Sequence, residues 1–186
     1  MSLQFQPMPL LKRRSPFDDP NWIFELKYDG FRALAVIERA RAQLLSRNAQ
    51  FKNLLFRRGN PPCFFAFDLL TCDGRDLRTE RLLDRKQELR RLLARSPDSL
   101  LKYTEYIDGC GTVLFERICE LDLEGVVAKQ KFGPYVTERE HSTWYKILNR
   151  EYSQIQGREE LFERERHSEP VAGWHVCALA CEARGD

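Results

Sequence analysis

Three lysines and one glutamate stand at the ends or in the interior of strand-like segments. Lys27 ends one such segment, directly before an Asp-Gly turn. Glu124 precedes a second segment, and Lys129 lies at its far end. Lys146 lies within a third, apolar segment, where an unpaired ammonium is costly unless an anion meets it. Together the four side chains predict a pocket for a phosphate group and a metal ion.

The segments that carry these side chains predict a fold built largely from strands. Residues 22–28 and 31–37 are β-like on either side of Asp29-Gly30, and this dipeptide supplies the positive φ angles that a tight hairpin needs. Residues 41–47 predict a third strand. Residues 63–70 predict a fourth, and their apolar run favours a central position in a sheet.

Helical periodicity occurs in two places. Leucines recur at helical spacing between Thr79 and Ser96, which predicts an amphipathic helix with Thr79 as its N-cap. A shorter helix is expected over residues 112–121, and further strands over residues 101–107, 125–129 and 144–148. The apolar segment at 171–183 leaves two interpretations open, a docked helix or a surface for a partner.

The composition is that of a globular protein. The chain has 186 residues, of which 42% are hydrophobic and 31% charged, so the disordered and membrane-spanning classes are excluded. The formal net charge is only +2, so any contact with nucleic acid must be local. The six cysteines form no Cys-x-x-Cys pair, and the N-terminus lacks a signal-peptide pattern, which favours reduced thiols in the cytoplasm.

Three parts of the chain are expected. Residues 1–20 contain four prolines and the basic cluster Lys12-Arg13-Arg14, which predicts an irregular lead-in. Residues 21–150 carry the predicted strands and helices and form one domain. Residues 151–186 are expected to form a C-terminal tail.

Five short motifs follow one another along most of the chain. Each alone is weak, since Lys-x-Asp-Gly also occurs by chance in ordinary surface hairpins. In order they are residues 24–32 with Lys27-Tyr28-Asp29-Gly30, then Ser46-Arg47-Asn48, Phe67-Asp68-Leu69-Leu70 with residues 73–78, residues 124–129, and residues 144–146. This ordered set resembles the ATP-dependent DNA ligases of the covalent nucleotidyltransferase superfamily. Pro134-Tyr135 adds similarity to the small bacterial ligases associated with end joining.

The resemblance implies an α+β nucleotidyltransferase (adenylation) fold of antiparallel sheets flanked by helices, and it implies a chemistry. Lys27 would attack the α-phosphorus of ATP in the presence of Mg²⁺ or Mn²⁺, expel pyrophosphate and become a lysyl-AMP. AMP would then pass to the 5′-phosphate of nicked or broken double-stranded DNA, from which a 3′-hydroxyl displaces it. A lysine attacks only as the neutral amine, which at an ordinary pKa near 10.4 is about one molecule in a thousand at pH 7, so neighbouring cations are expected to lower that pKa.

The resemblance also implies roles for the surrounding residues. Contacts with ATP or AMP are implied for Glu25, Leu26, Arg32, Phe67, Lys129 and Lys146. Within this set Phe67 would stack on adenine, Arg32 would meet the ribose, and the main chain beside Glu25 would read the base edge. Glu124 would hold the metal ion, and Arg47 would face a DNA phosphate.

Three features depart from the family's pattern. Its Asp-Gly-Glu motif has no counterpart in residues 49–66, which contain no acidic residue. Leu148 stands where the fifth motif usually has a second lysine. The segment after Asn149 is too short for the OB-fold domain that usually follows, so we expect the adenylation fold without that domain.

The leading interpretation is therefore a ligase that seals DNA breaks in repair or recombination. It would act in the cytoplasm at the nucleoid, with end-joining or repair proteins as partners and no membrane contact. The departures leave a second interpretation open, a non-catalytic remnant that binds nucleotide or DNA. A third, an RNA ligase or capping-type nucleotidyltransferase, shares Lys-x-Asp-Gly, but Phe-Asp-Leu-Leu followed by Asp-Gly favours the DNA-ligase branch.

Overall fold

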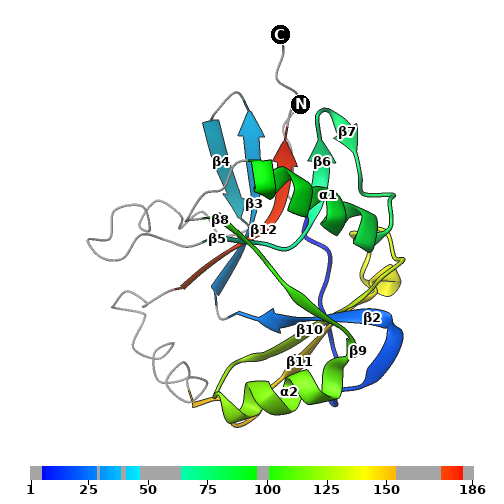
Figure 1. The fold of residues 1–186 in the computed structure, drawn as a ribbon, viewed down its shortest axis with the longest axis vertical. Helices are drawn as coiled ribbons and strands as arrows, with labels where there is room; N and C mark the ends of the chain where they lie inside the picture. Colours follow the sequence, from blue (N-terminus) through cyan, green and yellow to red (C-terminus); the bar gives the residue numbers. More distant parts are fainter. Residues whose placement is uncertain are drawn as a thin grey trace, which may run out of the picture.

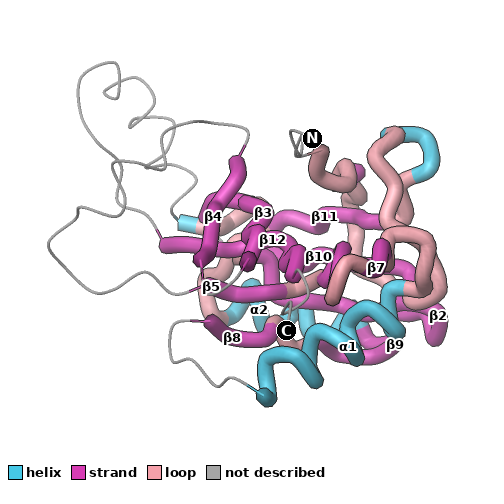
Figure 2. Tube along the Cα trace, turned by 90° about the horizontal axis from the view of Figure 1, so that it is seen from above, coloured by secondary structure: helices cyan, strands magenta, loops and turns pink. Residues whose placement is uncertain are grey.

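The fold is described from a computed structural model of the chain, which two views show at right angles (Figures 1 and 2). It describes residues 6–28, 30–38, 41–46, 64–95, 101–153 and 173–181. Within these ranges there are two five-stranded sheets and one two-stranded sheet, and a longer helix packs near each of the larger sheets. No helix in these ranges is long and apolar enough to cross a membrane.

The first sheet has the strand order β1-β11-β10-β2-β9. Its members are β1 (Leu11–Lys12), β2 (Asp18–Lys27), β9 (Tyr106–Cys110), β10 (Gly125–Gln130) and β11 (Trp144–Leu148). Successive residues of a strand point to opposite faces, and Phe24, Val126 and Ala128 share a core with Ile118 of α2 (Gly111–Glu120). Helix α2, at the bottom of Figure 1, therefore covers one face of this sheet and leaves the other face for the site.

The second sheet has the order β4-β3-β12-β6-β7. Its members are β3 (Gly30–Glu38), β4 (Arg41–Ser46), β6 (Leu69–Cys72), β7 (Arg75–Asp76) and β12 (Gly173–Cys181). Leu89 of α1 (Leu82–Arg95) packs in one core with Ala35 and Leu69. The two-stranded sheet pairs β5 (Phe64–Ala66) with β8 (Leu101–Tyr103), and the short 3₁₀ helix η2 (Arg139–His141) precedes β11. The α+β fold class is confirmed, although the sheets are mixed, since β12 runs parallel to both β3 and β6.

The hairpin predicted around Asp29-Gly30 is wrong. Strands β2 and β3 belong to different sheets, and Figure 1 shows them running in different directions. Both edges of β2 are taken, by β10 on one side and β9 on the other, so β3 cannot pair with it. The chain instead passes from one sheet to the other after Lys27, and the hairpin forms one strand later, between β3 and β4. Asp29 itself lies outside the described residues.

Two predicted strands are interrupted. The strand expected over 63–70 is split into β5 and β6, because the Asp68 carboxylate accepts a hydrogen bond from the next backbone N–H, that of Leu69, at 2.9 Å. The strand expected over 101–107 is split into β8 and β9, because Thr104 still bonds to Ala66 beside the two-stranded sheet, whereas β9 pairs with β2 in the first sheet. The other predicted strands, at 41–47, 125–129 and 144–148, are confirmed as β4, β10 and β11.

Both predicted helices are present, but the expected cap at Thr79 is wrong. Helix α1 begins at Leu82, and its first N–H groups are satisfied by a loop far away in sequence. Leu82 N donates to Gly133 O, and Leu83 N donates to Lys131 O, both at 3.1 Å. The apolar segment at 171–183 has two interpretations from its sequence, a docked helix or a partner surface. Part of it forms strand β12 of the second sheet, and not a helix.

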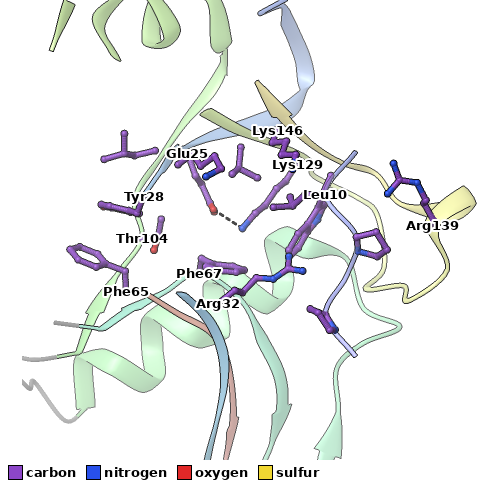
Figure 3. Close-up of a pocket in the computed structure, with 16 residues that line it drawn as sticks. Leu10, Glu25, Tyr28, Arg32, Phe65, Phe67, Thr104, Lys129, Arg139 and Lys146 are labelled. Atoms are coloured by element: carbon purple, nitrogen blue, oxygen red, sulfur yellow. Dashed lines mark ion pairs between the residues drawn. The ribbon is translucent and has the colours of Figure 1, made fainter. Parts of the chain in front are cut away.

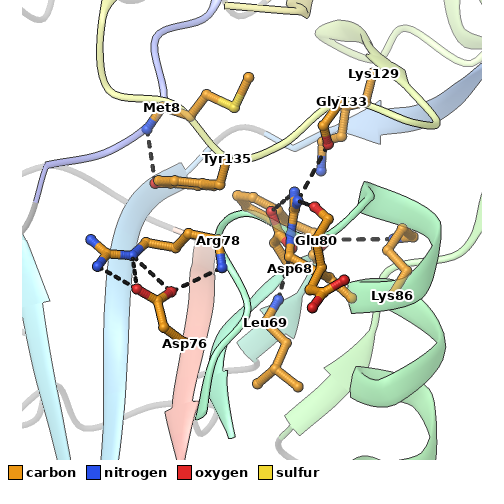
Figure 4. A network of polar contacts seen from close by, with 12 residues as sticks. Met8, Asp68, Leu69, Asp76, Arg78, Glu80, Lys86, Lys129, Gly133 and Tyr135 are labelled. Atoms are coloured by element: carbon orange, nitrogen blue, oxygen red, sulfur yellow. Dashed lines mark hydrogen bonds and ion pairs between the residues drawn. The ribbon is translucent and has the colours of Figure 1, made fainter.

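The N-terminal lead-in is irregular but docked. Met8 is fully buried beside Ile23, Leu82 and Trp144, and its backbone N–H donates to the Tyr135 hydroxyl at 2.8 Å (Figure 4). Strand β1 then pairs with β11, and β2 begins at Asp18, before the boundary expected at residue 21. The lead-in thus forms part of the folded structure near the site.

We expect Gly125→Ala to lower the free energy of unfolding by about 2–4 kcal/mol. Gly125 has a φ of +149°, and a Cβ there would collide with the carbonyl oxygen of Ile147 in the adjacent strand. Gly74→Ala is the matched control: its φ of +74° is also positive, but a Cβ would meet nothing within 4 Å, so about 1 kcal/mol is expected. Urea denaturation measures both, and equal losses would contradict the steric argument.

Candidate active site

The strand register gathers the predicted site residues on one face of the first sheet. Gly125 pairs with Lys27, and Val127 pairs with Glu25 on one side and with Lys146 on the other. Because side chains alternate along a strand, Glu25, Lys27 and Lys146 share the face opposite the α2 core. The residue before β10, Glu124, is thereby brought beside Lys27.

A cavity of about 620 Å³ opens on this face (Figure 3). Seven of the predicted residues line it, namely Glu25, Leu26, Lys27, Arg32, Phe67, Lys129 and Lys146. Its other lining residues were not among the predicted site residues, namely Pro7, Pro9, Leu10, Tyr28, Phe65, Thr104, Val127, Arg139 and Trp144. Arg47 lies outside the described residues, so the structure says nothing of its expected contact with DNA.

Lys27 and Glu124 form an ion pair through Nζ and Oε1. Both side chains are mostly buried, 19% and 13% exposed, so the pair is less screened than a surface pair. The other carboxylate oxygen, Oε2 of Glu124, is buried and has no hydrogen-bond partner among the described residues. The ion pair orients the Lys27 amine, and it leaves one oxygen of Glu124 available to a ligand.

This oxygen fits the metal ion that the resemblance implies. The described residues contain no group of three His, Cys, Asp or Glu side chains that could enclose a metal. Mg²⁺ is usually held by only one or two carboxylates, together with water and substrate phosphates. Glu124 therefore fits as the protein ligand of an ion whose remaining ligands come from a phosphate-bearing substrate and water.

Lys129 is buried among aromatic rings. Its side chain is 1% exposed, and Nζ lies 2.5 Å from Oε2 of Glu25, close enough for an ion pair but without hydrogen-bond geometry. The ammonium also lies 3.9 Å from the ring centre of Phe67 and 4.3 Å from that of Trp144. Burial lowers the pKa of Lys129 to about 8, although Glu25 opposes the shift. Lys129 is thus a cation held in place at an energetic cost.

Lys86 on α1 is a buried partner that the sequence analysis missed. Nζ of Lys86 donates to Oε1 of Glu25 at 2.6 Å and to the carbonyl oxygens of Thr104 and Phe67 at 3.1 and 3.4 Å. The Glu25 carboxylate therefore lies between two ammonium groups, Lys86 and Lys129. Lys86 fixes Glu25 and, through it, the position of Lys129.

A second buried ion pair joins Arg85 to Asp68, the residue directly after Phe67 in the sequence. Asp68 receives two hydrogen bonds from the Arg85 guanidinium, at 2.8 and 3.0 Å, and both side chains are fully buried. Arg85 also donates to the carbonyl oxygens of Glu80 and Gly133. The sequence contains a signal for both missed cations, because Arg85 and Lys86 lie on the helix face that also carries Leu82 and Leu89.

The N-terminal lead-in forms part of the cavity wall, on the side away from Tyr28 and Phe65. Nη1 of Arg32 donates to the carbonyl oxygen of Met8 at 2.9 Å, and Pro7, Pro9 and Leu10 line the wall. Figure 3 shows Leu10 and Arg139 away from Tyr28 and Phe65, which lie at the other end. The cavity therefore has an aromatic end and an end near which Arg32, Lys146 and Arg139 supply positive charge.

We expect Lys129→Met to raise the free energy of unfolding at pH 7 by about 1–3 kcal/mol, because it removes a desolvated ammonium while Glu25 keeps Lys86. The folded-state pKa near 8 lies below the ordinary value of 10.5, so the folded state binds fewer protons than the unfolded chain between these pH values. The stability contribution of Lys129 therefore rises with pH over this window, and the advantage of the variant should shrink by pH 10.

Lys86→Met is the matched control for this stability prediction. It removes three hydrogen bonds and should lower the free energy of unfolding by about 2–4 kcal/mol. Guanidinium denaturation of both variants at pH 7 and pH 10 gives the comparison. A Lys129→Met protein clearly less stable than wild type at pH 7 would mean that Lys129 holds the fold together.

Comparisons of the sequence identify relatives of one kind. A family model described as "ATP dependent DNA ligase domain" matches residues 51–147, just over half of the chain. The chain is 26% identical to the bifunctional non-homologous end joining protein LigD of Bacillus subtilis, over 79% of this chain and 34% of that protein. It is also 26% identical to the SPbeta prophage-derived DNA ligase-like protein LigB of B. subtilis, over 80% of this chain and 69% of that protein. The chain thus spans about a third of one relative and two thirds of the other.

Solved structures share the fold. The ligase domain of LigD from M. tuberculosis superposes with a TM-score of 0.59 at 25% identity, covering 77% of this chain and 60% of that one. A mycobacterial DNA ligase D complexed with ATP and MES gives a TM-score of 0.61 at 24% identity, covering 79% of this chain and 62% of that one. With its cavity, its motifs and these matches, the chain belongs to the family of ATP-dependent DNA ligase domains, as an adenylation domain of the LigD and LigB type.

Proposed function

We propose that this chain is an adenylating domain that forms a lysyl-AMP on Lys27 and serves the sealing of DNA strand breaks. The observation that carries the proposal is the mostly buried Lys27 amine in a cavity that also contains an aromatic ring, Phe67, and further cations. Such a cavity suits a molecule with a flat apolar part and several negative charges. ATP has both parts.

The side chains divide the work as follows. Lys27 Nζ forms the bond to the α-phosphorus while the bond to the bridging oxygen breaks and pyrophosphate leaves. Lys129 and Lys146 offset the negative charge that develops on the phosphate oxygens, and Arg32 supplies a further positive charge near these two lysines. Lys146 makes no ion pair within the described residues, so its ammonium is available to the ligand. A divalent ion at Glu124 supplies further charge neutralisation when it is bound.

A basic groove gives the proposal a place for DNA. It has a volume of about 740 Å³ and is lined by Lys12, Arg13, Arg14, Leu148, Asn149 and Arg150. Its four cations are exposed, and among the described residues none of them has a carboxylate partner. Elsewhere on the described surface, Arg81, Arg90 and Arg117 each pair with an acidic residue. Unneutralised cations of this kind attract the phosphates of a nucleic acid backbone.

Lys27→Arg should abolish adenylation without unfolding the protein. A guanidinium keeps the charge that pairs with Glu124 but cannot act as a nucleophile near neutral pH. The measurement is intact mass after incubation with ATP and Mg²⁺ or Mn²⁺ in the presence of pyrophosphatase. Wild type should gain the mass of one AMP, and chelation of the metal should prevent the gain.

The result also decides between the proposal and a non-catalytic remnant. A folded wild-type protein that gains no mass under any of these conditions would favour the non-catalytic remnant. The missing Asp-Gly-Glu motif is the sequence feature that supports this alternative. An AMP adduct that persists in Lys27→Arg would show that another residue is the nucleophile.

The charge of the basic groove should set the salt dependence of DNA binding. In the triple variant Lys12→Gln/Arg14→Gln/Arg150→Gln, the slope of log K against log salt for nicked DNA should fall by about 2–3, since each phosphate contact contributes about 0.9. Arg13 is kept because its guanidinium packs 4.0 Å from the ring centre of Phe17. The control variant Arg81→Gln/Arg90→Gln/Arg117→Gln removes three paired cations. Fluorescence anisotropy measures both, and equal slopes would contradict a role for the groove.

A further inference from the structure

Thr104 places a buried hydroxyl without a partner at the wall of the cavity. The residue is 2% exposed, and its Oγ1 has no hydrogen-bond partner among the described residues. A buried hydroxyl that makes no hydrogen bond costs about 1–3 kcal/mol, so such groups are rare. Thr104 is also a lining residue of the cavity, which gives its hydroxyl access to whatever the cavity binds.

Two hydrogen bonds hold the backbone of the residue that carries this hydroxyl. Thr104 N donates to the carbonyl oxygen of Ala66 at 2.8 Å, and Thr104 O accepts from Lys86 at 3.1 Å. The same Lys86 ammonium binds Glu25 at 2.6 Å, so Thr104 and Glu25 are held against a common cation. A hydroxyl on a backbone that is held in this way is already near its place before a ligand arrives.

The surroundings of Thr104 indicate which part of a ligand it meets. Figure 3 shows Thr104 beside Tyr28 and Phe65, at the side of the cavity away from Arg139. Tyr28 and Phe65 stack with ring centres 4.4 Å apart, so this end presents flat apolar surface. A phosphate here would lie away from Arg139, whereas the edge of a heterocyclic base would find both apolar contact and the hydroxyl.

We propose that Thr104 Oγ1 is a base-recognition group, which accepts a hydrogen bond from the exocyclic amine of adenine when ATP occupies the cavity. This inference rests on the proposed function and names one residue that recognises its substrate. The hydrogen bond satisfies the hydroxyl, which the described residues leave without a partner. Thr104 is therefore a determinant of affinity for ATP and takes no part in phosphoryl transfer.

The test pairs a substitution with a ligand change. Thr104→Val keeps the shape and removes the hydroxyl, and Thr104→Ser keeps the hydroxyl. Equilibrium binding of ATP and of purine riboside triphosphate, which lacks the 6-amino group, is measured by titration calorimetry in the Lys27→Arg background, so that no AMP is transferred. We expect Thr104→Val to lower the affinity for ATP about tenfold and Thr104→Ser to lower it less than about threefold. The analogue without the 6-amino group should bind with equal affinity to the Thr104→Val protein and to the protein that keeps Thr104.

The outcomes separate the inference from the proposed function. Equal weakening of ATP and the analogue by Thr104→Val, or no weakening of either, would overturn base recognition by Thr104. With Lys27 present, the KM for ATP in lysyl-AMP formation should rise while the rate at saturating ATP stays within about twofold. A protein that binds ATP in the expected pattern but forms no lysyl-AMP would overturn the proposed function and leave the assignment of Thr104 intact. Absence of ATP binding would overturn both.

Discussion

The cavity depends on one buried carboxylate that is shared by two ammonium groups. Glu25 projects from β2 and meets Lys86 from α1 through one oxygen and Lys129 from β10 through the other. Any one of these charges alone in the interior would be strongly unfavourable. Together they tie a helix to two strands at the floor of the cavity, and they fix the positions of Glu25 and Lys129 there.

The same arrangement leaves a surplus of positive charge where negative charge is expected to bind. Two ammonium groups face one carboxylate, and burial lowers the pKa of Lys129 to about 8. Stability alone would favour an apolar residue at this position. The cost is understandable if the site awaits a phosphate, because an anion would stabilise the charged form of Lys129 and recover the desolvation penalty. Oε2 of Glu124 and Oγ1 of Thr104 are also buried without a hydrogen-bond partner among the described residues, so they too are polar atoms that a bound ligand would satisfy.

The cavity is also assembled from distant parts of the chain. The lead-in reaches it through Met8, which is buried against Ile23, Leu82 and Trp144 and is fixed by the Tyr135 hydroxyl. Its backbone carbonyl then anchors Arg32 from the second sheet. The first residues of the described chain therefore connect the two sheets, and a change in the lead-in would be felt on the Arg32 side of the cavity.

The sequence by itself determined the family, the α+β class, most strands, both helices and seven residues of the cavity wall. It could do so because motif order and hydrophobic periodicity are local properties that survive at low identity. It could not determine that β2 and β3 belong to different sheets, since an Asp-Gly dipeptide favours a turn but does not specify which strands flank it. Nor could it assign the partners of Lys86 and Arg85, because these partners lie 61 and 17 residues away in sequence and meet the two cations only when α1 is packed on the strands. Tertiary structure alone decided which charges are buried together, because burial removes the water that would otherwise satisfy each of them separately.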